Sequence, residues 1–363
     1  QRKRKEWEET QVNLFRVQQK SLKLQQTQEA GSIFINEVKN IVVTVVAATA
    51  VIQGHMTLGM MLAVQYIIGQ LNSPVEQLMN FFYSVQDVKI SLERINEIHQ
   101  MDDENGKEGL LTGLDHPEDG IHISNILFKY DPHALRKTID GVDIHIPQGK
   151  VTAIVGASGS GKTTLIRLML GYYPVLEGKI TIGNTDINQL NRKWWRRQCG
   201  VVMQEGVIFL ESIGRNIAVD DAEIDEARLM KAAEIACIRD YVMALPLKFN
   251  TKIGRDGVGL SQGQKQRILI ARAVYKSPDY IFLDEATNSL DANNERNIVE
   301  NLDKFYQGKT VVIVAHRLST VKNADQIVVL DQGKVVEVGN HESLTAKRGA
   351  YYNLVKNQLE LGN

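Results

Sequence analysis

The sequence predicts a layered α/β domain preceded by a long helical hairpin, and three observations carry that prediction. From residue 121 to the end, short apolar β-branched runs alternate with helical stretches, as expected for a sheet of parallel strands that is buried on both faces. Residues 1 to about 100 have an almost unbroken helical pattern with two apolar runs. Residues 101–120 are acidic and rich in glycine, which predicts a solvated linker between the two parts.

Length and composition limit the possible classes of protein. The 363 residues suffice for two domains, and a charged fraction of 23% is ordinary for a globular protein. The formal net charge of -1 argues against a nucleic-acid partner, because such partners select a basic face. Cys199 and Cys237 lack metal-ligand spacing, so we expect both to be reduced thiols. The charged start, Gln1–Lys5, is no signal peptide and lacks an initiator methionine, which indicates a fragment of a longer protein.

The first part reads as two long helices joined by a turn at Gln53–Thr57. Its first apolar run, Ile41–Ile52, reaches spanning length only when it is extended back over Glu37 and Lys39. We expect the spanning parts at about residues 32–53 and 56–80. A proline at position 74 predicts a kink in the second helix, which membrane helices tolerate.

Charge placement favours a membrane hairpin with both ends in the cytoplasm. Basic residues flank the hairpin at positions 2–5, 16, 20, 23, 89 and 94, whereas the turn carries none. A soluble amphipathic helix pair explains the hydropathy equally well, and that alternative stays open. On the membrane interpretation, the polar arc of the second helix supplies candidates to line a substrate cavity, namely Gln65, Asn72, Glu76 and Asn80.

A phosphate-binding loop follows the predicted strand Val151–Val155. The run GASGSGKT fits the pattern G-x-x-x-x-G-K-[ST] and opens the predicted helix Thr164–Leu170. In such a loop, backbone N–H groups and a helix N-terminus converge on phosphates. Lys162 is expected to neutralise the β- and γ-phosphates, and the Thr163 hydroxyl to ligate Mg²⁺. The motif predicts a P-loop NTPase with nucleotide-binding residues Gly156, Ala157, Ser158, Gly159, Ser160, Gly161, Lys162, Thr163 and Thr164.

Two carboxylates end another apolar strand, Tyr280–Leu283. Asp284 is placed to hold Mg²⁺, directly or through water, and Glu285 to orient or deprotonate the attacking water. Carboxylates at a strand end can also cap the next helix, but the phosphate loop favours the catalytic interpretation. The apolar runs Val311–Ala315 and Ile327–Leu330 predict further parallel strands of the same sheet.

The run Leu260–Gln264 (LSQGQ), followed by KQR, resembles the signature motif of the ATP-binding-cassette (ABC) family. The resemblance covers residues 121 to 358, with the other family elements in order. It implies an ABC-type nucleotide-binding domain with a helical subdomain and an antiparallel β part, and hydrolysis of MgATP by a head-to-tail dimer. In that dimer Ser261, Gly263, Gln264 and Asp291 would contact the ATP held by the second copy.

The same resemblance implies three further roles and shows two departures. Tyr130 would stack on adenine, Gln204 would touch Mg²⁺ and sense the transmembrane part, and His316 would be the catalytic switch residue that contacts the γ-phosphate. At the third signature position, Gln262 replaces the usual glycine, for which we expect modest effects. Arg255 stands where exporters commonly carry an acidic or neutral residue, which puts coupling in doubt rather than hydrolysis.

The front of the chain, at residues 54–59 and 65–75, resembles the last two transmembrane helices of half-size exporters, with peptidase-containing bacteriocin exporters the most similar. The basic start at Gln1–Glu9 would then be a remnant of an intracellular coupling helix. The resemblance implies a bacterial inner (cytoplasmic) membrane location, contact with membrane lipid, and export of a bacteriocin-like peptide. Export of a lipid or drug-like substrate, and a soluble regulatory or mechanical ABC ATPase with a helical docking region, remain alternatives.

Overall fold

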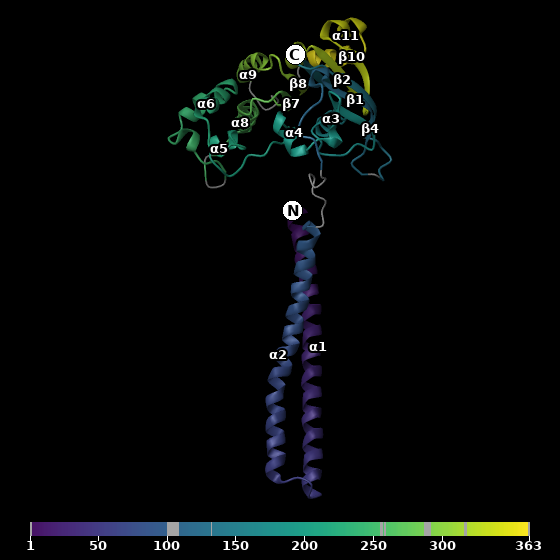
Figure 1. The fold of residues 1–363 in the computed structure, drawn as a ribbon, viewed down its shortest axis with the longest axis vertical. Helices are drawn as coiled ribbons and strands as arrows, with labels where there is room; N and C mark the ends of the chain where they lie inside the picture. The colour runs from purple at the N-terminus through teal and green to yellow at the C-terminus, as the bar shows by residue number, and fades with distance from the viewer. Residues whose placement is uncertain are drawn as a thin grey trace. The chain divides into compact units, whose positions relative to one another are not determined.

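The computed structural model describes residues 2–99, 109–131, 133–254, 257, 259–286, 292–315 and 318–361. Contacts divide the chain into two compact units, Gln1–Asp102 and Asp103–Asn363. The first consists of two long helices and the second of sheets and shorter helices (Figure 1).

The first unit is a helical hairpin of α1 (Arg2–Ile52) and α2 (Leu58–His99), as predicted. Gly54, with a φ of 76°, lies just past the end of α1, where a left-handed residue can terminate a helix without a steric penalty. At the start of α2, Thr57 Oγ1 accepts a hydrogen bond from the Met60 backbone N–H at 3.3 Å, which caps the helix.

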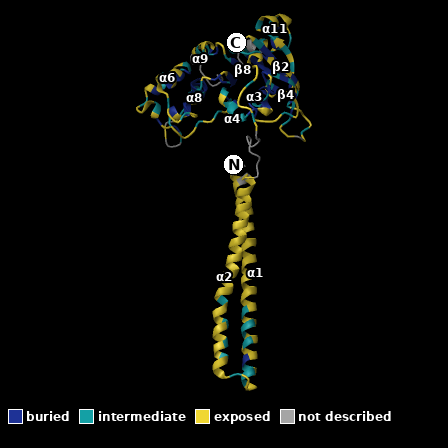
Figure 2. Cartoon of the chain, in the orientation of Figure 1, coloured by how far each residue is buried: buried dark blue, intermediate teal, exposed yellow. Residues whose placement is uncertain are grey.

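Side chains between α1 and α2 are covered mainly in the half of the hairpin next to the turn (Figure 2). This half-buried or buried seam contains Val43, Ala47, Ala48, Val51, Met61, Val64 and Ile68. Most other large apolar side chains of the two helices face outward, and Phe34 is 70% exposed and Phe81 61% exposed. Apolar surface of this extent is unusual for a surface in water and marks a face that further molecules or segments cover.

One helix of the described residues is long and apolar enough to cross a bilayer, the part of α1 from Trp7 to Ile52. The second predicted span, residues 56–80, does not meet the same measure of length and composition, because Gln65, Gln70 and Asn72 interrupt its apolar run. That span stays a prediction.

The core of the second unit is a six-stranded sheet in the order β10-β9-β3-β8-β7-β6. Its strands are β3 (Val151–Val155), β6 (Cys199–Val202), β7 (Tyr280–Asp284), β8 (Thr310–Val314), β9 (Gln326–Asp331) and β10 (Lys334–Gly339). All neighbours are parallel except β10, which is antiparallel to β9. The four predicted strands are thus confirmed to within one residue at each end. Both cysteines are free thiols, and Cys199 is buried.

A second, antiparallel sheet has the order β2-β1-β4-β5. It comprises β1 (Ile121–Phe128), β2 (Ile139–Ile146), β4 (Glu177–Ile182) and β5 (Thr185–Asp186). Its inner face shares one hydrophobic core with strands of the parallel sheet, where Ile121, Ile180 and Val312 are fully buried. The antiparallel part of the predicted fold class is therefore present.

Helices cover the parallel sheet and form a separate group on one side of the unit (Figure 1). The α-helices are α3 (Lys162–Met169), α4 (Arg192–Gln198), α5 (Ile213–Ile217), α6 (Glu226–Ile235), α7 (Arg239–Met243), α8 (Gln262–Tyr275), α9 (Ala292–Phe305), α10 (Leu318–Val321), α11 (His341–Lys347) and α12 (Ala350–Leu361). The 3-10 turns are η1 (Pro117–Asp119), η2 (Ile187–Gln189) and η3 (Lys248–Asn250). Contacts of α8 with α5 and α6 build the predicted helical subdomain.

The described part of the predicted linker is attached to the second unit. The Leu111 backbone pairs with Gln189 and Asn191 at 2.8 and 2.9 Å, and the Asp115 N–H donates to Thr185 Oγ1 at 3.0 Å. Leu114 packs against the core between the sheets. Most side chains of residues 109–120 are exposed, as their composition indicated, but Leu114 and several backbone groups are fixed to the second unit.

Candidate nucleotide-binding site

Glycines shape the loop between β3 and α3. Gly156 has a φ of 154°, and a Cβ there would collide with the Leu330 carbonyl oxygen. Gly161 has a φ of 105°, and its Cβ would come within 2.7 Å of Ile139 Cδ1. Gly161 is also the N-cap of α3, so the loop presents the unpaired N–H groups of the first helical turn. Such a helix start is suited to bind an anion.

Lys162 is buried within this loop. Its ammonium donates to the carbonyl oxygens of Gly156 and Ala157, both at 2.9 Å. Burial lowers the pKa of Lys162, and the nearby charges of Glu285 and Asp284 oppose that shift. Because both carboxylates act on this ammonium, the structure brings the predicted lysine and acidic pair into one electrostatic environment.

Asp284 lies at the end of β7 and is fully buried. Its Oδ1 accepts a hydrogen bond from Thr163 Oγ1 at 3.2 Å, which joins the phosphate loop to the strand. Within the described ranges, Oδ2 has no hydrogen-bond partner. Burial raises the pKa of Asp284, while the Thr163 hydrogen bond acts in the opposite direction.

Glu285 has an unusual backbone for a residue with a side chain, because its φ is 52°. Its N–H donates to the Val314 carbonyl at 3.0 Å, and its carbonyl accepts from Gln266 Nε2 at 3.4 Å. The carboxylate accepts from Gln204 Nε2 at 3.1 Å. A left-handed non-glycine residue costs on the order of 1–3 kcal/mol, so these contacts hold the backbone in a strained, defined position.

The donor set at this edge of the sheet fits Mg²⁺. It offers the Thr163 hydroxyl, the Asp284 carboxylate with its partnerless buried oxygen, and the amide oxygen of Gln204. Oxygen atoms are the ligands of this hard cation, which is usually held by one or two carboxylates together with phosphates. Among the described residues there is no group of three or more His, Cys, Asp or Glu that could hold a metal by itself.

Tyr130 follows β1 and borders the phosphate-loop helix. Its hydroxyl hydrogen-bonds Thr164 Oγ1 at 3.1 Å and accepts from Arg167 Nη1 at 3.3 Å. The ring makes edge contacts with Phe128 and Tyr173 and is 48% exposed. Tyr130 thus lies beside the phosphate-loop helix, and its contact with adenine stays a prediction.

Ser261 is the N-cap of α8 and part of a reciprocal capping box. Ser261 Oγ accepts from the Gln264 N–H at 3.2 Å, and the Ser261 N–H donates to Gln264 Oε1 at 2.8 Å. The hydroxyl keeps its own proton for a further acceptor. Ser261 is exposed and Gly263 is half-buried, so the start of α8 lies at the surface.

Three residues singled out in the sequence, Arg255, Asp291 and His316, lie outside the described residues. Two hydrogen bonds of the site were not predicted, the one from Gln266 to the Glu285 carbonyl and the one from Arg167 to the Tyr130 hydroxyl. Gln266 is 4% exposed and lies on the apolar face of α8, with Ile270 one turn further on. A polar residue on an apolar helix face is the signal that could have found it.

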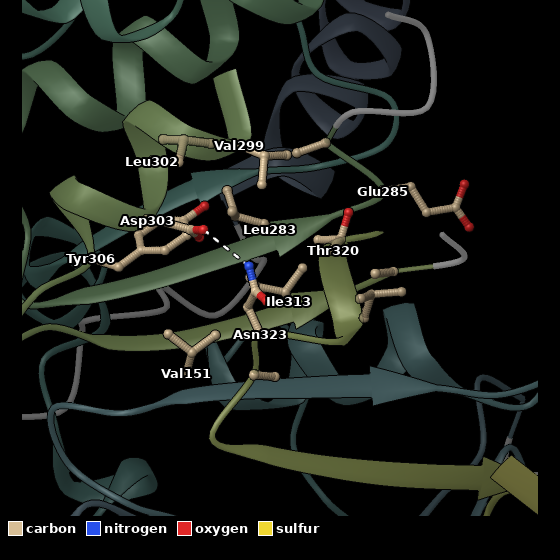
Figure 3. A pocket seen from close by; sticks show the side chains of 14 residues that line it. Val151, Leu283, Glu285, Val299, Leu302, Asp303, Tyr306, Ile313, Thr320 and Asn323 are labelled. Carbon is tan, nitrogen blue, oxygen red and sulfur yellow. Dashed lines mark hydrogen bonds between the residues drawn. The ribbon is translucent and has the colours of Figure 1, made fainter. Parts of the chain in front are cut away.

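A small cavity of about 40 Å³ lies behind Glu285, between β7, β8 and α9 (Figure 3). Its walls are mostly apolar, with Asp303 and Asn323 joined by a 3.5 Å hydrogen bond at one end. The Glu285 carboxylate points away from the apolar side chains (Figure 3). A space of this size holds a few water molecules at most, so it is no nucleotide pocket.

Comparison with known proteins identifies relatives of this chain. Residues 139–288 match the family model of the ABC transporter. The leukotoxin translocation ATP-binding proteins LktB of Mannheimia haemolytica and Bibersteinia trehalosi are 39% identical over 314 residues, which cover 86% of this chain and 44% of theirs. The chain thus spans less than half the length of these curated relatives.

A solved structure of a bacterial Atm1-family ABC exporter with ATP bound superimposes with a TM-score of 0.80 and 30% sequence identity. The match covers 90% of this chain and 57% of that one, so it extends over the helices as well as the sheets. The chain therefore has the fold of an ABC exporter, with a helical region followed by an ABC-type nucleotide-binding domain.

Proposed function

We propose that this chain is the ATP-binding and ATP-hydrolysing part of an ABC exporter, which works as a head-to-tail dimer and powers export of a peptide. One observation carries the ATPase part of the proposal. The phosphate loop and the Asp284–Glu285 pair meet at one edge of the parallel sheet, joined by the Thr163–Asp284 hydrogen bond.

The residues at this edge of the parallel sheet have separate proposed roles. Backbone N–H groups from Gly156 to Thr164 and the Lys162 ammonium hold the phosphates of ATP. Thr163, Asp284 and Gln204 would hold Mg²⁺, which when bound would neutralise phosphate charge. Glu285 takes a proton from the attacking water or orients it. Tyr130 stacks on adenine.

The second half of each site comes from a second copy of the chain. The start of α8 carries partial positive charge, and with the Ser261 hydroxyl it suits a γ-phosphate. Gly263, Gln264 and Asp291 would lie beside Ser261 on that face. His316 would contact the γ-phosphate from the copy that carries the phosphate loop.

A polypeptide cargo is supported by the relatives named for leukotoxin translocation. The finer proposal is a bacteriocin-like peptide, exported through the bacterial inner membrane with the nucleotide-binding domain in the cytoplasm. The outward apolar side chains of α1 and α2 support contact with lipid and with further helices. Gln65, Asn72, Glu76 and Asn80 are the proposed cavity residues, and the first two already contact α1.

The test is Glu285→Gln in the transporter with its complete membrane domain. We expect ATP hydrolysis to fall by roughly 10²–10⁴-fold, the usual worth of a general base, and an ATP-bound dimer to accumulate. The matched control is Glu300→Gln, since Glu300 is exposed on α9 and pairs only with Arg296 in the described part of the chain. Unchanged hydrolysis in Glu285→Gln would remove Glu285 from its assigned role.

Partitioning separates the exporter from a soluble ABC ATPase. The exporter should require detergent to leave the membrane fraction. Recovery of the protein from the aqueous fraction without detergent would instead favour a soluble ATPase with a helical docking region.

A further inference from the structure

A lysine lies between α1 and α2 and contacts both helices. Lys39 Nζ donates to Asn72 Oδ1 of α2 at 2.6 Å and to Asn36 Oδ1 of its own helix at 3.1 Å. All three residues are half-buried, whereas most of their neighbours on the two helices are exposed. The ammonium is therefore directed at the second helix and not along the outer surface of α1.

The position of Lys39 in the sequence gives its depth in the proposed membrane. Ile52, at the turn end of α1, follows 13 residues later, which corresponds to about 20 Å along a helix. The hydrocarbon core of a bilayer is about 30 Å thick. On the proposed orientation, Lys39 thus lies about two-thirds of the way from the outer edge towards the cytoplasmic edge.

The charge of Lys39 has no acidic partner in the described part of the chain. Both bonding partners are neutral amides, and the exposed Glu37 and Glu76 form no ion pair with it within 4.0 Å. The next contact along the seam, from Gln65 Nε2 to Thr44 Oγ1 at 3.2 Å, is also neutral. An ammonium has three N–H donors, of which the two amides use two. A cation at this depth is costly unless it is paired or serves a pathway.

We propose that Lys39, with Asn36 and Asn72 as positioning amides, is a subsite for a carboxylate of the exported cargo, so that the exporter prefers acidic peptides. The third N–H of Lys39 is the donor for that carboxylate. A lipid phosphate is the competing anion, and the direction of the ammonium into the seam favours cargo over lipid. This inference rests on the proposed export function and names the chemical class of its substrate.

The experiment measures peptide binding to the transporter, with its complete membrane domain, in nanodiscs of phosphatidylcholine. The probes are three dye-labelled peptides that differ only in carrying Glu, Gln or Lys at the same positions, and the readout is fluorescence anisotropy. We expect the Glu peptide to bind about tenfold more tightly than the Gln peptide, as one charge-assisted hydrogen bond allows.

Two variants should remove this preference and two should keep it. Lys39→Met removes the cation. Asn72→Asp keeps the shape of the side chain but places a fixed carboxylate against the Lys39 ammonium, which then pairs with it instead of with the peptide. Lys39→Arg and the exposed Lys23→Met, outside the predicted span, should bind the Glu peptide as the wild type does. Asn72→Asp is decisive, because a lysine that only tethers the two helices would be strengthened by it and the peptide preference would not change.

Three results would overturn the inference. They are equal binding of the Glu and Gln peptides by the wild type, a preference that survives Asn72→Asp, and a preference that disappears when phosphatidylglycerol is added, which would assign Lys39 to lipid. Equal binding of all three peptides would contradict the Lys39 subsite but not peptide export. Failure of every peptide to bind would count against both the subsite and peptide export.

Discussion

At the scale of one residue, Asp284 lowers the stability of the folded protein at the position where the proposed site needs a carboxylate. The side chain is fully buried, one carboxylate oxygen accepts from Thr163, and the other has no partner in the described part of the chain. Burial raises its pKa above the usual value. A buried, incompletely paired carboxylate costs folding free energy, and the proposed binding of a cation there would account for its presence.

Asp284→Asn should therefore stabilise the protein without nucleotide and inactivate it. We expect a gain of about 1 kcal/mol near neutral pH and loss of most ATP hydrolysis. Thermal unfolding of the detergent-solubilised protein, together with phosphate release, measures both. A variant that is less stable than the wild type at neutral pH would show that the carboxylate is adequately paired.

The stability difference should also depend on pH with a defined sign. Because the folded-state pKa of Asp284 is raised, its contribution to stability is present at low pH and is lost as pH rises through that pKa. Lowering the pH from neutral should therefore bring wild type and Asp284→Asn closer together in unfolding temperature. A gap that widens on acidification would contradict the assignment.

The sequence predicted the residues of this site better than their conformations. Lys162, Thr163 and Asp284 follow from a motif and from the end of an apolar strand, since both features are local. The left-handed φ of Glu285 and the hydrogen bond from Gln266 depend on contacts between β7, β8 and α8, which no local pattern encodes. In the hydropathy pattern Lys39 only interrupts an apolar run, because its partner Asn72 is 33 residues away and no local pattern joins the two.

At the scale of an element, the start of α8 serves two purposes. The Ser261–Gln264 capping box satisfies backbone groups of the first turn, and the same turn faces solvent where a second copy would bring ATP. A serine at this position is therefore expected for structural reasons alone, and its presence does not separate a cap from a phosphate contact.

Ser261→Asp separates the two purposes. Aspartate caps a helix as well as serine does, so the unfolding temperature should stay close to that of the wild type. Its negative charge would meet the γ-phosphate of the second copy, so ATP-dependent dimer formation should be lost. The companion Ser261→Ala should lower stability by about 1 kcal/mol. Normal ATP-dependent dimers of Ser261→Asp, seen by size-exclusion chromatography, would exclude the proposed contact.

The predicted helices and strands agree best with the structure where the side chains on both faces are buried. The strands of the parallel sheet appear in the sequence as continuous apolar runs because both faces are covered. Residues 109–120 have a polar composition and mostly exposed side chains, yet their backbone pairs with the second unit, which composition does not report.

At the scale of the whole molecule, the proposed site is composite. Each ATP would lie between the phosphate loop of one copy and the α8 start of the other, so a dimer holds two sites that share both chains. Damage to either half inactivates a dimer of identical copies.

Two inactive variants should consequently restore activity when they are mixed. A dimer of one Lys162→Met copy and one Ser261→Asp copy has one site with both defects and one with none. With random pairing and independent sites, hydrolysis should return to at most about a quarter of the wild-type rate. Each variant alone is the control. Mixtures of co-reconstituted copies that stay as inactive as the separate variants would argue against sites shared between chains.

The attachment of residues 109–120 has a practical consequence for anyone who expresses the ATPase part alone. A gene cut at Ile121, where the first strand begins, would remove Leu114 from the core between the sheets and leave the Gln189 carbonyl and the Asn191 N–H without their Leu111 backbone partner. A protein that starts at Gly109 should be more soluble than one that starts at Ile121, and it should unfold at a higher temperature. The useful boundary of this nucleotide-binding domain lies a dozen residues before its first strand.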